Sequence, residues 1–250
     1  MPPRYEVIGV EGLPEIGRGD DLVRAIAHAS VLQGTPLAGG DLLVVSQKIV
    51  SKAEGRVVRL AEITPSAETV LMAEELGRDP RLIEVILRES RRIVRRDKGV
   101  LIVETHQGWI CANAGVDQSN VDADTACLLP EDSDRSARGL RDGLRALTGH
   151  ALGIVIADTF GRPWREGLTN VAIGVAGIEP LKSYLGEKDP AGHVLQATIL
   201  ALADELASAA EPIMGKLDRI PVVIIRGLDW TRGESGSGPL LRDPSRDLFR

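Results

Sequence analysis

Residues 153–162 place side chains suited to binding phosphate and metal directly after an apolar run. Residues 153–157 are apolar or small, and Asp158, Thr159, Gly161 and Arg162 follow them. Such a run is typical of a strand buried on both faces. We expect this strand to end at Asp158, so that the polar side chains emerge at the carboxyl edge of a sheet, where α/β proteins collect ligands. An ordinary capped turn uses the same residue types.

A second candidate segment is residues 113–120, in which small residues let the backbone approach a ligand. Asp117 and Asn120 offer a carboxylate and an amide three residues apart. Hard divalent cations prefer oxygen ligands, and two carboxylates from different strands can hold metal-bound phosphates. Asp117 and Asp158 are the natural pair for this role. A turn with an Asx cap would equally account for the residue types at positions 113–120.

Two further segments carry polar side chains after apolar runs. Residues 45–55 contain two serines and two lysines just beyond a predicted strand. Their hydroxyl and ammonium groups could hold phosphate oxygens, and a polar turn leading into a strand at 56–60 is the alternative. The fourth segment is Met214-Gly215-Lys216, where the glycine is typical of a helix C-cap.

These segments lie within an alternating pattern of strands and helices, which predicts an α/β fold. We expect strands at residues 7–10, 42–45, 100–103, 109–112, 153–157, 171–178 and 221–225. We expect helices after a cap at Asp20 and Asp21, twice between residues 65 and 96, around 140–147, and at 194–210. The arginine run through Arg96 is interpreted as the solvated face of a helix, and residues 231–244 as a loop.

Composition excludes several classes of protein. The chain has 250 residues, a formal net charge of −6 and 3% aromatic residues, so neither a nucleic-acid-binding surface nor a base-stacking platform is expected. Cys111 and Cys127 lack zinc-ligand spacing and are expected to be reduced. No apolar run approaches the roughly 20 residues that span a bilayer, and no secretory signal is present, so a cytoplasmic protein without membrane contact is expected.

Common nucleotide and hydrolase motifs are missing from the sequence. There is no G-x-x-x-x-G-K-[ST] loop and no G-x-G-x-x-G fingerprint, so a bound nucleotide must be held by a less common scaffold. There is also no G-x-S-x-G elbow and no H-E-x-x-H helix.

Taken together, the segments resemble the coenzyme F420-0:L-glutamate ligases, the gamma-glutamyl ligases of coenzyme F420 biosynthesis. The resemblance covers nearly the whole chain and lies in these ordered stretches: 12–16, 19–22, 40–41, 46–55, 114–117 with 119–120, 157–162, 203–205, 214–216 and 223–227. It implies one ligase domain over residues 1–250, with two interleaved subdomains left open. It also implies a mixed-sheet α/β ligase fold, an intertwined homodimer and a standalone form without a nitroreductase-like domain.

The resemblance further implies an activity. Such enzymes use GTP as co-substrate to join L-glutamate to the lactyl carboxylate of coenzyme F420-0, and then extend the tail through gamma-linked glutamates. They use manganese or magnesium at two sites, and potassium is a candidate further cation. The phosphodiester of the deazaflavin substrate, or its carboxylate tail, could meet Arg162 and Arg165, although a structural ion pair explains these arginines equally well.

Site residues follow from the resemblance by position. GTP would be bound by Leu13, Pro14, Glu15, Ile16, Ser46, Lys52, Asn120, Met214, Gly215 and Lys216. Metal would be bound by Asp117 and Asp158, with Thr159 at a second metal position. Lys216 stands where some relatives have an acidic residue, which leaves the role of its loop open between metal and phosphate.

Two other functions remain compatible with these residues. A metal-dependent phosphohydrolase or kinase acting on another phosphorylated metabolite could use the same aspartates without needing glutamate. A non-catalytic nucleotide-binding module would keep the aspartates for structure, and metal would not strengthen its binding of GDP. Dependence of turnover on glutamate separates the ligase from the phosphohydrolase or kinase, and a GDP-binding titration with and without manganese separates it from the binding module.

Overall fold

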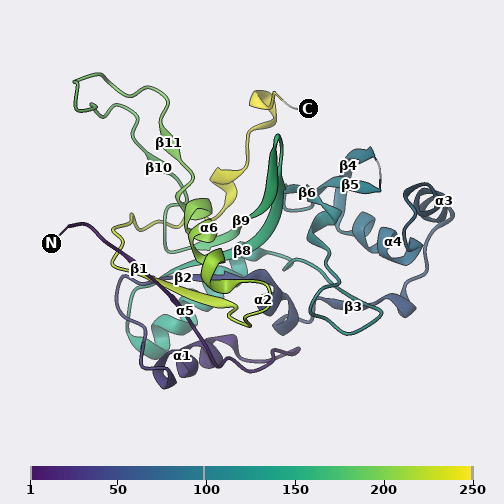
Figure 1. The fold of residues 1–250 in the computed structure, drawn as a ribbon, viewed down its shortest axis with the longest axis horizontal. Helices are drawn as coiled ribbons and strands as arrows, with labels where there is room; N and C mark the ends of the chain where they lie inside the picture. Colours follow the sequence, from purple (N-terminus) through teal and green to yellow (C-terminus); the bar gives the residue numbers. More distant parts are fainter. Residues whose placement is uncertain (1, 98, 249–250) are drawn as a thin grey trace.

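The protein is a mixed α/β structure built on a central five-stranded sheet, described here from a computed structural model that covers residues 2–97 and 99–248 (Figure 1). The strand order is β1-β12-β2-β8-β9, and β2 is parallel to β8 while the other neighbours are antiparallel. The strands are β1 (Glu6–Gly9), β12 (Val222–Arg226), β2 (Leu42–Ser46), β8 (Gly153–Arg162) and β9 (Arg165–Ala176). The predicted mixed α/β class is therefore confirmed.

Helices cover both faces of this sheet because its central strands alternate apolar side chains between the two sides. Leu43 and Val45 pack with α1 (Leu22–Leu32), α2 (Gln47–Ala53) and α5 (Ser133–Thr148). Leu42 and Val44 pack on the opposite side with α6 (Leu202–Met214). These four apolar residues of β2 are each 0% exposed, so β2 forms the centre of the core.

A second, smaller lobe lies at one end of the molecule (Figure 1). Its core contains Leu60, Ile83, Ile86 and Leu101, which form a hydrophobic cluster separate from the two around the central sheet. Its elements are β3 (Val57–Arg59), the 3-10 turn η1 (Leu60–Glu62), α3 (Ala67–Leu76), α4 (Pro80–Arg88), β4 (Ser90–Asp97), β5 (Val100–Thr105), β6 (Ile110–Ala112), η2 (Asn113–Gly115) and β7 (Thr125–Cys127). Strands β4, β5 and β6 form one sheet, and β3 pairs with β7.

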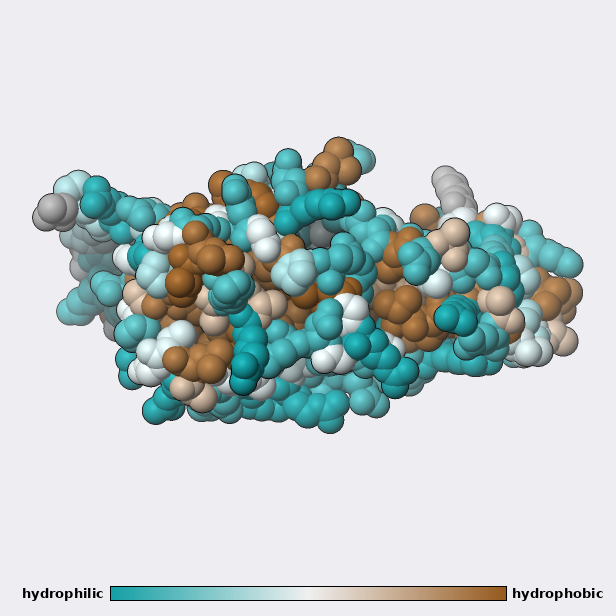
Figure 2. Space-filling model, turned by 90° about the horizontal axis from the view of Figure 1, so that it is seen from below, coloured by the Kyte–Doolittle hydropathy of each residue, from teal (hydrophilic) through white to brown (hydrophobic). Residues whose placement is uncertain are grey.

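A two-stranded arm, β10 (Lys182–Ser183) with β11 (Ile199–Leu200), extends away from the main body (Figure 1). The chain ends in a segment with two 3-10 turns, η3 (Gly238–Leu240) and η4 (Pro244–Arg246). Hydrophobic side chains form separate groups among hydrophilic ones on the face shown in Figure 2. In the described part of the chain, no helix combines the length and apolar character needed to cross a membrane.

Most predicted elements are confirmed within a few residues. The side chain of Asp21 caps α1 as expected, and Gly215 ends α6 with a positive φ of 54°. The strand pair at 100–112 is β5 with β6. The predicted loop at 231–244 is confirmed apart from the short turn η3 and the first residue of η4.

Four local predictions were wrong. The strand at 153 does not end at Asp158, because β8 continues to Arg162 through pairing with β9. The alternative of a polar turn for residues 45–55 fails because Ser46 caps the helix α2. The arginine run lies on strand β4, not on a helix. Helix α6 begins at Leu202, so residues 194–201 belong to the arm and its return.

The contact between α5 and β9 predicts opposite effects for two glycine substitutions. A Cβ at Gly174 would overlap the main-chain carbonyl of Ser133, which cannot rotate away, so Gly174→Ala should lower the free energy of unfolding by ~1–3 kcal/mol. A Cβ at Gly139 in α5 meets nothing within 4 Å, so Gly139→Ala should raise it by ~0.5–1 kcal/mol. Urea unfolding measures the free energy of unfolding of both variants. Equal values for Gly174→Ala and Gly139→Ala would contradict the packing of α5 against β9.

Candidate active site

Three loops meet at one edge of the central sheet. The N–H of Val10, just after β1, donates to the Val222 carbonyl at 2.8 Å, and the N–H of Ser46, at the end of β2, donates to the Pro221 carbonyl at 2.8 Å. Ser46 is also the Cα partner of Ala157 in β8. The segments after β1, after β2 and before β12 therefore leave the sheet together, and Asp158 lies one residue beyond the last β2 pair. Neighbouring strands are about 4.8 Å apart, so β1 and β8 are separated by about 14 Å.

Helix α2 carries two lysines from this edge. The Ser46 hydroxyl accepts a hydrogen bond from the Lys48 N–H and so starts the helix. Lys48 and Lys52 are four residues apart and therefore lie on the same face of the helix. Lys52 Nζ is 2.6 Å from Glu15 Oε1, which ties the loop after β1 to α2. Hydrogen bonding and the charge of Lys52, with a smaller effect of Arg219, hold the pKa of Glu15 below its usual value.

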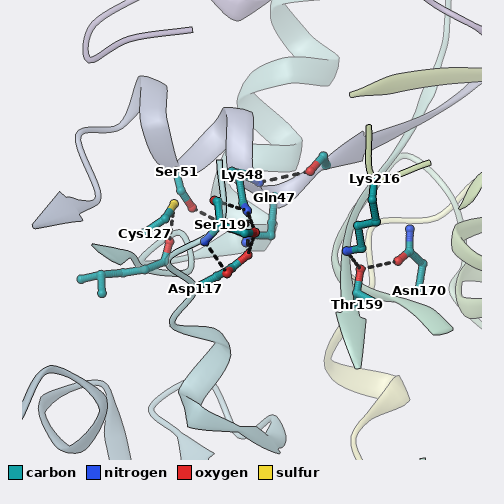
Figure 3. A network of polar contacts seen from close by, with 11 residues as sticks. Gln47, Lys48, Ser51, Asp117, Ser119, Cys127, Thr159, Asn170 and Lys216 are labelled. Atoms are coloured by element: carbon teal, nitrogen blue, oxygen red, sulfur yellow. Dashed lines mark hydrogen bonds and ion pairs between the residues drawn. The ribbon is translucent and has the colours of Figure 1, made fainter. Parts of the chain in front are cut away.

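Asp117 reaches this edge from the smaller lobe. Its Oδ2 is 2.6 Å from Lys48 Nζ, which also donates to the carbonyl and hydroxyl oxygens of Ser119 (Figure 3). The Ser119 N–H and hydroxyl donate to Asp117, so the predicted Asx turn is present. Burial raises the pKa of Asp117, but the hydrogen bonds from Lys48 and Ser119 outweigh it and leave that pKa below its usual value.

Asp158 lies in a different electrostatic environment. Burial raises the pKa of this half-buried carboxyl from 3.8 to about 6; the N–H of Thr159 opposes the rise and the charge of Asp117 adds to it. Burial raises the pKa of the neighbouring Cys111 thiol to about 12, helped by the charge of Asp158. Within the described residues, no lysine or arginine forms an ion pair with Asp158.

Thr159 connects the sheet edge to the loop after α6. Its hydroxyl donates to Asn170 Oδ1 at 2.8 Å and accepts from Lys216 Nζ at 3.1 Å. Figure 3 shows this group as a network separate from the cluster of Lys48, Asp117 and Ser119. The positive charge of Lys216 also acts on Asp158 and lowers its pKa. Lys216 therefore contacts Thr159, and both Lys216 and Asp117 act electrostatically on Asp158.

The other predicted nucleotide-binding residues surround this place with different degrees of exposure. Ile16 and Met214 are buried in the core, and Leu13 packs against it, so these side chains hold the backbone of their loops. Gly215 has a backbone that favours glycine. Asn120 is exposed, follows Ser119 and has φ of 55°. Pro14 is exposed beside Glu15.

The side chains at this edge suit a hard divalent cation. Among residues 2–97 and 99–248, no three His, Cys, Asp or Glu side chains gather to hold a metal ion. Asp158 nevertheless has a half-buried carboxylate without an ion-pair partner in this part of the chain, and the charge of Asp117 acts on it. Oxygens of this type are what Mg²⁺ and Mn²⁺ prefer, and Mg²⁺ commonly completes its shell with phosphate and water oxygens.

Two residues in this group were missed by the sequence reasoning. Asn170 on β9 donates from Nδ2 to Glu211 Oε2 on α6 at 2.8 Å, while its Oδ1 accepts from Thr159. Neither residue lies in a recognisable motif, and only the pairing of β8 with β9 brings Asn170 opposite Thr159. The sequence also did not predict that Lys48 forms an ion pair with Asp117 or that Lys52 forms one with Glu15.

Arg162 and Arg165 lie at the far end of the β8–β9 hairpin. They are direct partners across the hairpin, and both are exposed. Arg162 Nη2 donates to the Glu166 carbonyl at 2.9 Å, so this arginine stabilises the hairpin end itself.

The fold and this edge define a mixed α/β protein with paired carboxylates, hydroxyls and lysines gathered from both lobes. Residues 12–227 match the family model described as F420-0:Gamma-glutamyl ligase, so the chain belongs to this family of ligase enzymes.

Named relatives match over almost their whole length. The chain is 47% identical to a protein named Coenzyme F420:L-glutamate ligase from Methanothermobacter thermautotrophicus, over 98% of each chain. It is 47% identical to the protein of that name from Methanopyrus kandleri, over 93% of this chain and 92% of the relative. It is 41% identical to the one from Methanocaldococcus jannaschii, over 99% of this chain and 97% of the relative.

The raised pKa of Asp158 predicts that Asp158→Asn stabilises the protein without metal. Because its pKa is above the unfolded value, the ionised carboxylate opposes folding at pH 7.5, and a neutral amide should raise the free energy of unfolding by ~1–3 kcal/mol. The gain should shrink as the pH falls through about 6, where the wild-type carboxyl is protonated. Urea unfolding in EDTA at pH 7.5 and pH 5 measures it.

Asp117→Asn is the matched control for this measurement. Hydrogen bonds from Lys48 and Ser119 lower the pKa of Asp117, so replacing its carboxylate by an amide should lower the free energy of unfolding at pH 7.5. A wild-type protein more stable than Asp158→Asn at pH 7.5 would contradict the environment described for Asp158.

Proposed function

We propose that this chain joins L-glutamate to coenzyme F420-0 with the use of GTP, and then extends the tail through gamma-linked glutamates. The family and the names of its relatives support the ligase activity. The observation that best supports the finer proposal is that Asp158, on the central sheet, feels the charges of Asp117 from the smaller lobe and of Lys48 and Lys216. Such a cluster suits a triphosphate with divalent metal.

The nucleotide would lie along the edge between β1 and β8. The loop of Leu13, Pro14, Glu15 and Ile16 is held to α2 by the ion pair of Glu15 with Lys52. The ammonium groups of Lys48, Lys52 and Lys216 can neutralise phosphate oxygens as point charges. Ser46, Asn120 and the backbone at Gly215 add short polar groups along the same edge.

The reaction needs an activated carboxylate, because a carboxylate is a poor electrophile. In the first step its oxygen attacks the γ-phosphorus of GTP, an O–P bond forms, and the bond from phosphorus to the bridging oxygen breaks to release GDP. In the second step the amino nitrogen of glutamate attacks the acyl carbon of the acyl phosphate, and phosphate and one proton leave. The contribution of the chain is mainly to position the reactants and to neutralise charge.

Manganese or magnesium would be held by Asp117 and Asp158, with Thr159 at a second position. When bound, the metal supplies positive charge to the transferring phosphoryl group. Asp117 must then share its oxygens between Lys48 and the cation, and Thr159 must share its oxygen between Lys216 and the cation.

The activity is tested by mass spectrometry of coenzyme F420-0 incubated with the protein, GTP, Mn²⁺ and L-glutamate, omitting each component in turn. Asp117→Asn and Asp158→Asn should each lower turnover at least ~100-fold, because charge neutralisation at the phosphoryl group is lost. Asp142→Asn, a surface change beside Arg141, should retain wild-type turnover.

The omission series separates the alternatives. GTP cleavage in the complete mixture without any glutamylated product would contradict the ligase and favour the phosphohydrolase or kinase acting on another metabolite. GDP binding that Mn²⁺ does not strengthen, without any cleavage, would contradict it in favour of a nucleotide-binding module. Turnover near the wild-type value in either aspartate variant would refute the assigned metal ligands.

We also propose a homodimer in which the β10–β11 arm contacts a second copy. The arm exposes Leu185, Val194, Ile199 and Leu200, which are between 37% and 51% exposed. Exposed apolar residues on a projecting arm are stabilised by burial against a partner.

Leu185→Asp combined with Val194→Asp should convert the dimer to a monomer, because both side chains are exposed on the arm and a charge there opposes its burial. Light scattering measures the mass in solution. Leu71→Asp, an equally polar change on exposed Leu71 of α3, should leave the mass unchanged. A wild-type protein that is monomeric at micromolar concentration would contradict the homodimer.

A further inference from the structure

A chain of hydrogen bonds runs from α6 through the sheet to the candidate metal site. Glu211 on α6 accepts from Asn170 Nδ2 at 2.8 Å, and Asn170 Oδ1 accepts from the Thr159 hydroxyl at 2.8 Å. The Thr159 oxygen in turn accepts from Lys216 Nζ at 3.1 Å. These three hydrogen bonds thus join α6, β9, β8 and the loop after α6.

The carboxylate of Glu211 fixes which atom donates and which accepts in each of these hydrogen bonds. A carboxylate has only acceptor oxygens, so Glu211 requires the amide nitrogen of Asn170 to face it. The Asn170 oxygen must then face Thr159. An oxygen there can only accept, so the single proton of the Thr159 hydroxyl points inward, toward Asn170.

The outer side of Thr159 is consequently an oxygen without a proton. Such an oxygen can receive the ammonium group of Lys216 or a metal ion, and it cannot donate a hydrogen bond to a phosphate oxygen. Asn170 is 5% exposed, so reversing the amide would leave buried groups without partners, which costs about 1–3 kcal/mol.

We infer that Glu211 and Asn170 are positioning residues that orient the Thr159 hydroxyl as an acceptor, so that Thr159 receives a cation at this site. Neither residue touches the reactants; each acts through Thr159. The inference rests on the proposed use of this site for metal and nucleotide, because it assigns Thr159 to the cation and not to the phosphate.

Removing the acceptor at position 211 tests this inference. In Glu211→Gln the amide oxygen can still accept from Asn170 Nδ2, so Asn170 Oδ1 keeps facing Thr159. In Glu211→Ala no acceptor remains, so Asn170 can adopt either orientation and the Thr159 proton is no longer held inward. The Kd for Mn²⁺, measured by electron paramagnetic resonance on the full chain, should rise about 10- to 100-fold in Glu211→Ala and less in Glu211→Gln.

A double variant should restore binding. When Glu211→Ala is combined with Asn170→Asp, the new carboxylate at position 170 has only acceptor oxygens and accepts from the Thr159 hydroxyl. The hydroxyl proton of Thr159 then returns to its inward direction, and the Kd for Mn²⁺ should recover toward the wild-type value. Glu205→Gln, an exposed change on the same helix, controls for loss of charge and should leave the Kd unchanged.

Three results would overturn the inference. They are equal Kd values for Glu211→Gln and Glu211→Ala, a double variant that binds Mn²⁺ no better than Glu211→Ala, and a Thr159→Val variant that binds Mn²⁺ as the wild type does. If Glu211→Ala does not fold, as judged by circular dichroism, the double variant and Thr159→Val still decide the matter. Failure of the wild type to glutamylate coenzyme F420-0 would instead refute the proposed function, because the Mn²⁺ measurements do not depend on turnover.

Discussion

The parallel pairing of β2 with β8 is the constraint on which the candidate site depends. Five consecutive Cα pairs, from Leu42 with Gly153 to Ser46 with Ala157, bring the two strands to the same edge in register. Parallel strands point their carboxyl ends the same way, so the start of α2 and the carboxylate of Asp158 emerge together. A register shift of one residue would turn Asp158 to the other face of the sheet.

The two aspartates illustrate how environment separates identical side chains. Asp117 has its charge balanced by Lys48 and its turn fixed by Ser119, so it contributes to folding as well as to the site. Asp158 is half-buried with a raised pKa, which means that the folded protein bears an electrostatic cost at neutral pH. A cation would relieve this cost, and perturbed carboxyls of this kind are frequent at functional sites.

The site is also a junction between lobes. Asp117 lies beside β7 in the smaller lobe, through its bridge to Cys127, whereas Asp158, Thr159 and Lys216 belong to the sheet and the loop after α6. The ion pair of Lys48 with Asp117 therefore links the two lobes through the side chains that would bind ligand. A change in the spacing of the lobes would alter the distance between the two carboxylates, which is a geometric basis for coupling domain position to ligand binding.

The sequence by itself determined the class of fold, most of the strands and helices, and the segments that carry polar chemistry. These features depend on local periodicity and on short runs of letters, such as the apolar residues 42–45 before Ser46 and 153–157 before Asp158. It misjudged the arginine run and the extent of β8, because strand β4 and the end of β8 are formed by pairing with distant or later strands. Only the tertiary structure decided that Lys48 pairs with Asp117 while Lys52 pairs with Glu15, and that Asn170 and Glu211 orient Thr159. Such pairings depend on the register of strands and the packing of α6, which bring together residues 11 to 69 positions apart and which no local pattern records.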